Sequence, residues 1–120
     1  MRTGSMWRAI GLNLGFFGLL FLLHIVAARF NADTAFTAVA LLITLHVFFF
    51  GPACLVVSRL SSQEHRRLLN QRGALASFPL ALGLGWAYGG MAWSWPEWPL
   101  VLTAWLAVHA MMDRRLALGV

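Results

Sequence analysis

This chain contains four long runs in which most residues are apolar, and nearly every charged residue lies at an edge of one of these runs. A helix needs about 20 apolar residues to cross a bilayer, so each run predicts one membrane-spanning helix. The runs cover approximately residues 10–28, 35–57, 74–93 and 96–112. We therefore predict an all-α integral membrane protein with four transmembrane helices in an up-down bundle. The connections are short, so residues 1–120 are expected to form a single transmembrane domain.

The composition agrees with this pattern, since 60% of the residues are hydrophobic and 11% are charged. A soluble domain of this size needs more polar surface than the chain supplies. These proportions exclude a soluble enzyme module and a nucleic-acid-binding protein. They make the lipid bilayer the first expected partner.

All nine cationic residues are arginines, and eight of them lie on one side of the predicted bundle. Those eight precede the first run, join the second to the third, or follow the fourth: Arg2, Arg8, Arg59, Arg66, Arg67, Arg72, Arg114 and Arg115. Only Arg29 lies on the other side. Arginine-rich segments resist translocation, so both termini and the link at residues 59–73 are expected in the cytoplasm. We predict a multi-pass protein of a bacterial-type inner membrane.

The first run has a second interpretation, as a cleaved signal peptide. It follows a basic segment, and Val26, Ala27 and Ala28 resemble a small-residue cleavage site. Its 19 apolar residues, at positions 10–28, are long for the apolar part of a signal peptide and favour a retained anchor. Both interpretations stay open from the sequence, and cleavage would leave three helices with the same orientation.

Small and weakly polar residues recur at helical spacing in three of the runs. In a bilayer such residues let two helices approach closely, because no hydrophobic force drives helices together there. The predicted helix-packing residues are Gly11, Gly15 and Gly18 in the first run, Thr37, Thr44 and Gly51 in the second, and Gly85 and Gly89 in the third. Three such faces exceed what one small bundle buries internally, so we expect contacts with other membrane subunits or with copies of this chain.

Pro52 lies inside the second run, directly after Gly51. Proline removes one backbone hydrogen bond and can kink a helix. In a small bundle we expect a static bend, because neighbouring helices satisfy the freed carbonyl group.

Polar side chains at membrane depth are the best candidates for chemistry, since their burial without partners is costly. The chain offers four, namely Asn13, His24, His46 and His109. Asn13 and His24 share the face of the first helix that is opposite its glycines. His109 precedes Asp113 by one helical turn, where the two side chains can pair. No acidic or basic residue lies at mid-membrane depth, which argues against a proton-coupled antiporter.

His24 and His46 are the weak candidates for cofactor binding, because histidine is a common axial ligand of haem. At a rise of about 1.5 Å per residue, their backbones differ in depth by about 10 Å. A bis-histidine haem needs ligands near one level. We therefore predict hydrogen bonds between helices for these imidazoles, with no haem, no metal site and no other cofactor.

No group of residues has a catalytic signature, so the chain is not expected to be an enzyme. The expected function is association, as an accessory or assembly subunit of a larger membrane complex or as a homo-oligomer. One alternative is a small transporter or channel built from two or more copies, with Asn13, His24, His46 and the face that carries Thr37 and Thr44 along its pathway. Another is a membrane redox protein that uses the histidines as ligands.

Overall fold

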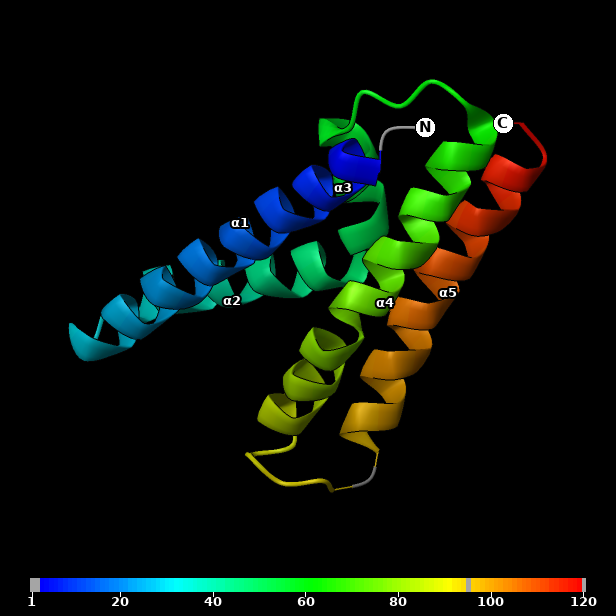
Figure 1. Cartoon of the computed structure of the whole chain (residues 1–120). Helices are drawn as coiled ribbons and strands as arrows, with labels where there is room; N and C mark the ends of the chain where they lie inside the picture. The colour runs from blue at the N-terminus through cyan, green and yellow to red at the C-terminus, as the bar shows by residue number, and fades with distance from the viewer. Residues whose placement is uncertain (1–2, 95, 120) are drawn as a thin grey trace.

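The computed structural model describes residues 3–94 and 96–119, so Arg2 lies outside the described part of the chain. Within this part the chain forms helices and no strand (Figure 1), which confirms the predicted all-α class. The five helices are α1 (Thr3–Arg29), α2 (Asp33–Phe48), α3 (Phe50–Val57), α4 (Gln63–Tyr88) and α5 (Glu97–Ala117).

The helices form two hairpins, α1 with α2 and α4 with α5, and α3 connects them by packing against α1 and α4. Both hairpins start from the end of the molecule that holds the two termini, and they diverge toward their turns (Figure 1). Asn31 forms the turn after α1 with a φ of 52°, and the Ala32 N–H group donates to the Ala27 carbonyl at 2.9 Å. Asparagine tolerates this left-handed conformation, which lets α2 return along α1.

The predicted second membrane-spanning helix is divided into α2 and α3, which are bent by 81° relative to each other. The division lies at Phe49, three residues before the expected kink at Pro52. A proline ring clashes with the carbonyl group four residues earlier. That carbonyl belongs to Phe48, where α2 ends. Pro52 then occupies the first turn of α3, where a backbone N–H group is not needed.

Helix α4 begins inside the segment that the sequence predicted as a link, residues 59–73. Ser62 precedes the helix, and its hydroxyl accepts a hydrogen bond from the His65 N–H group at 3.5 Å. A serine in this position satisfies one of the free N–H groups at a helix start. Arg66, Arg67 and Arg72 therefore lie on a helix and have defined directions.

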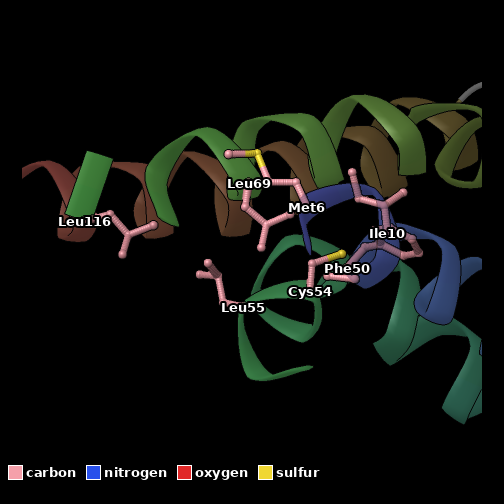
Figure 2. Close-up of a cluster of buried hydrophobic side chains, with 8 residues drawn as sticks. Met6, Ile10, Phe50, Cys54, Leu55, Leu69 and Leu116 are labelled. Carbon is pink, nitrogen blue, oxygen red and sulfur yellow. The ribbon is translucent and has the colours of Figure 1, made fainter. Parts of the chain in front are cut away.

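Two clusters of buried side chains hold the hairpins together. The first lies at the end that carries the termini, where side chains from α1, α3 and α4 converge (Figure 2). Its buried members are Met6, Ala9, Ile10, Phe50, Cys54, Leu55, Leu69 and Leu116. The second lies farther along the hairpins and contains Leu20, Ile43, Val47, Ala81 and Trp105. Each cluster draws on four helices, so the hairpins are packed against each other over part of their length.

Among the described residues, α1 is the one helix that is long and apolar enough to cross a membrane by itself, over Gly4–Arg29. The bent pair of α2 and α3 passes the same test when the two are counted together. Charged residues confine the uncharged segments of α4 and α5 to residues 73–88 and 98–112, which are shorter than about 20 residues. The predicted four-helix membrane bundle is therefore not confirmed.

Helix α1 differs from a core helix of a soluble protein in its exposure. Only 22% of its apolar window is buried inside the structure. The remaining apolar surface has no cover within the described chain, and exposed apolar areas of this extent mark contact with lipid or with another protein.

Candidate functional site

The break between α2 and α3 leaves the N–H group of Gly51 without a partner in its own helix. His109 of α5 accepts this hydrogen bond through Nε2, at a distance of 2.9 Å. The other ring nitrogen, Nδ1, lies 2.8 Å from the Trp105 carbonyl oxygen, which can only accept. We therefore assign the proton to Nδ1, so that the neutral imidazole joins α5 to the start of α3.

Gly51 is also a point of close approach between helices. A Cβ atom at this position would overlap Asn70 Oδ1 and would lie 2.8 Å from Cδ2 of His109. A Cβ atom on Gly73 of α4 would lie 3.1 Å from the Gly51 Cα atom. Two glycines thus allow α3 to lie directly on α4. The sequence predicted Gly51 as a packing residue and missed Gly73, which falls in the segment interpreted as a link.

Two buried polar side chains of α4 face α5. Asn70 donates through Nδ2 to the His109 carbonyl at 3.2 Å, and the Ser77 hydroxyl accepts from the Trp105 indole N–H group at 2.9 Å. Sequence reasoning missed both residues. The signal that could have found them is a stripe of small and polar residues at steps of three and four: Asn70, Gly73, Ser77, Ala81 and Gly85.

Asn13 of α1 and His46 of α2 form a second buried polar contact. The Asn13 amide donates to the Ala9 carbonyl at 2.9 Å, which turns its Oδ1 toward His46 Nε2, also at 2.9 Å. His46 therefore donates a hydrogen bond from α2 to α1. A groove of about 460 Å³ lies beside this pair, and its other walls are the apolar residues Leu12, Phe16, Ala53, Val56 and Val57.

His24 lies apart from His46. Its ring stacks on Phe36 of α2 with the ring centroids 4.0 Å apart, whereas His46 lies beside Asn13. Asn13 and His24 are separated by 11 positions on α1, or about 16 Å at the helical rise. Two imidazoles at that separation cannot ligate one iron. Among the described residues, no three histidine, cysteine, aspartate or glutamate side chains lie together in a way that could hold a metal ion.

Asp113 pairs with α4 and not with His109, the partner that the sequence spacing allowed. Arg67 donates to both carboxylate oxygens, at 3.0 and 3.1 Å, and Gln71 donates to one of them at 2.9 Å. The hydrogen bonds from Arg67, and then from Gln71, lower the pKa of Asp113, and the carboxylate in turn raises the pKa of Arg67. Water reaches both groups, so the pair contributes little to stability.

The predicted glycine faces differ in what they meet. A Cβ atom on Gly85 would lie 2.6 Å from the Cα atom of Trp98, so this glycine permits contact between the backbones of α4 and α5. A Cβ atom on Gly89 would lie 2.7 Å from the Ala92 carbonyl oxygen, in the turn between these helices and not against a third helix. The three predicted packing glycines of α1, Gly11, Gly15 and Gly18, have nothing within 4 Å of the same position, and the same holds for Gly4 at the start of this helix.

Two threonines were predicted on the face of α2 that packs against other helices, and one of them contacts another helix. The Thr44 hydroxyl donates to the Ala40 carbonyl at 2.8 Å and is also hydrogen-bonded to the Tyr88 hydroxyl of α4. Thr37 is exposed. The predicted small-residue face of α2 is thus used in its second half, near the break.

Comparison with protein-family models, with curated proteins and with solved structures finds no match to this chain. The geometry is therefore the basis for a functional proposal. It offers a capped helix break at Gly51, a buried contact between Asn13 and His46, and an uncovered row of glycines on α1.

Proposed function

We propose that this chain is a small polytopic inner-membrane protein that acts by association, as an accessory or assembly subunit of a larger membrane complex or as a homo-oligomer. The observation that carries the proposal is the exposed surface of α1 formed by Gly11, Gly15 and Gly18, which the described chain leaves uncovered. We refer to this surface as the open glycine face.

The other glycine contacts of the chain support this proposal. Gly51, Gly73 and Gly85 each lie where the backbones of two helices meet. A glycine inside a helix costs about 1 kcal/mol relative to alanine. The three glycines of the open glycine face have no compensating contact within the described chain. A partner helix that approaches this face would supply one.

The proposal includes several membrane crossings with both termini in the cytoplasm. The turns of both hairpins lie away from the end that holds the termini (Figure 1). Trp93 and Trp98 pack near the turn of the second hairpin, with their ring centroids 6.4 Å apart, and tryptophan prefers the headgroup region. Local thinning of the bilayer accommodates helices as short as the uncharged parts of α4 and α5.

The contacts of α1 favour a retained anchor over a cleaved signal peptide. Met6, Ile10 and Leu20 are buried in the two core clusters, and Asn13 binds His46. Removal of residues 1–28 would expose both clusters and would leave the imidazole of His46 without its partner.

The orientation is testable with a reporter that is active only in the cytoplasm. Fusions at the C-terminus and at Ser61, in the connection between α3 and α4, should both give signal because these sites lie with the arginines. A fusion at Asp33 should give none. Activity at Asp33 together with silence at the other two sites would invert the proposed orientation.

Association is testable with Gly15→Leu. The leucine side chain has free space within the chain, so helical content should be retained, whereas the partner helix would be pushed away and association should fall by about ten-fold or more. Chemical cross-linking and co-purification in mild detergent measure this loss. Gly83→Leu is the matched control, since Gly83 of α4 also has nothing within 4 Å. Equal association of the two variants would contradict the role of the open glycine face.

The alternative functions receive less support from the same geometry. Broken helices in transporters present free helix ends to a substrate, but the end created here is occupied, because Gly51 donates to His109 and packs against Asn70. This favours a static bend over a transport pathway. The separation of His24 from His46 likewise disfavours a haem-based redox protein.

A further inference from the structure

The fold gathers the arginines of distant segments at one end of the molecule. In Figure 1 the start of α1, the connection before α4 and the end of α5 lie together. The other end of α1, whose last residue is Arg29, lies at the far end of its hairpin. Seven described arginines belong to the gathered end: Arg8, Arg59, Arg66, Arg67, Arg72, Arg114 and Arg115. We refer to this surface as the arginine end, and we propose that it binds the headgroups of anionic phospholipids.

The charge of the arginine end is largely uncompensated. Glu64 and Asp113 are the two described side-chain carboxylates at this end, so two negative charges lie among seven positive ones. Within the described residues the one ion pair joins Arg67 to Asp113. The remaining guanidinium groups can bind a further source of negative charge, and a phosphate diester of a lipid headgroup provides it in a geometry that guanidinium binds well.

Arg72 and Trp7 contact each other at this end of the molecule. The Arg72 Cζ atom lies 5.6 Å from the centre of the Trp7 ring, which joins α4 to α1. Its Nη1 atom lies 3.9 Å from the sulfur of Met6, and Met6 is completely buried. The guanidinium is thus held by a ring face and a core side chain and not by a carboxylate. Because the ring face contacts the guanidinium without accepting a hydrogen bond, the N–H groups that do not point at Met6 can bind phosphate oxygens.

The surroundings of Trp7 favour a lipid over a free phosphate ion. Trp7 is 58% exposed, and an indole ring with a polar edge prefers the headgroup level of a bilayer. The exposed apolar side chains of α1 follow directly along the helix, among them Leu12 and Leu14. A headgroup at Arg72 would therefore have its acyl chains beside an apolar helix surface. The inference rests on the proposed membrane insertion with the arginine end at the cytoplasmic leaflet.

The test compares two lipids that differ in headgroup charge. The full-length protein is purified in mild detergent, incubated with equal amounts of phosphatidylglycerol and phosphatidylcholine, and passed over a size-exclusion column. Mass spectrometry of the retained lipid then measures the ratio of the two lipids. We expect phosphatidylglycerol to be enriched, and Arg72→Gln to reduce the enrichment by about five-fold, the effect of one arginine near an anionic surface. Arg29→Gln is the matched control and should retain the enrichment of the unchanged protein.

Several outcomes would overturn the inference. These are equal retention of the two lipids by the unchanged protein, the same loss in Arg29→Gln as in Arg72→Gln, or complete displacement of phosphatidylglycerol by millimolar inorganic phosphate. If Arg72→Gln loses its helical circular dichroism, Arg8→Gln replaces it, because Arg8 is exposed, and an unchanged lipid ratio in that variant would count against the proposal. Alkaline carbonate extraction of cell membranes tests insertion separately, since release of the chain would contradict the proposed function whatever the lipid ratio.

Discussion

Replacement of Gly85 by alanine should lower the free energy of unfolding by about 3 kcal/mol, at the upper end of the usual cost of adding a methyl group to a packed interior. The new Cβ atom would lie 2.6 Å from the Cα atom and 2.8 Å from the Cβ atom of Trp98. A backbone atom cannot rotate away as a flexible side chain can. The contact is relieved only if α4 and α5 separate along part of their interface.

The matched control for this substitution is Gly83→Ala, two residues earlier in the same helix. Nothing lies within 4 Å of the position that its Cβ atom would take, so this variant should be neutral or slightly more stable, since alanine favours the helix by about 1 kcal/mol. Thermal unfolding in mild detergent, followed by circular dichroism, measures the difference. Equal stability of the two variants would show that α4 and α5 do not touch at Gly85.

Replacement of Gly51 by alanine is expected to have the second largest effect, a loss of about 2 kcal/mol. Its Cβ atom would overlap the Oδ1 atom of Asn70 and would crowd the ring of His109. His109 would have to move from the position in which it accepts the Gly51 N–H group, and a buried N–H group without a partner adds to the cost. The cost is smaller than at Gly85 because the overlapped atoms belong to side chains.

Two variants check this explanation. Gly83→Ala, the control already used for Gly85, makes the same chemical change outside the open glycine face and where nothing lies within 4 Å, and it should leave stability unchanged or slightly raised. The double variant Gly51→Ala with Asn70→Ala should recover part of the lost stability, because the overlapped oxygen is absent. No recovery in the double variant would place the source of the loss elsewhere than at Asn70.

The helical class and the arginine end could be predicted because they depend on local properties of the chain. Apolar runs as long as these favour helices over strands, and the arginines mark the ends of those runs. The helix boundaries were harder to predict from the sequence. Helix α4 begins at Gln63, within the predicted link, and the second run divides at Phe49. Apolar runs locate the part of a helix that avoids water, whereas capping at Ser62 and the clash caused by Pro52 decide where the helix begins or ends.

The candidate polar residues could be predicted from the sequence in part, for the same reason. Asn13, His46 and His109 stand out as polar residues within apolar runs, so their burial could be expected from the sequence. Their partners could not. His109 binds Gly51, 58 positions away, and Asp113 of the same helix binds Arg67. Helical spacing states which residues share a face, but it does not state which other helix that face meets.

The sequence by itself determined that this protein is helical, that its charges collect at the ends of its apolar runs, and that several glycine faces are available for packing. Only the tertiary structure decided how each face is used. Gly51 and Gly85 lie against other helices of the same chain, and the glycines of α1 remain open. The physical reason is that close packing depends on the shape of both partners, and the second partner comes from a segment that is distant in the sequence.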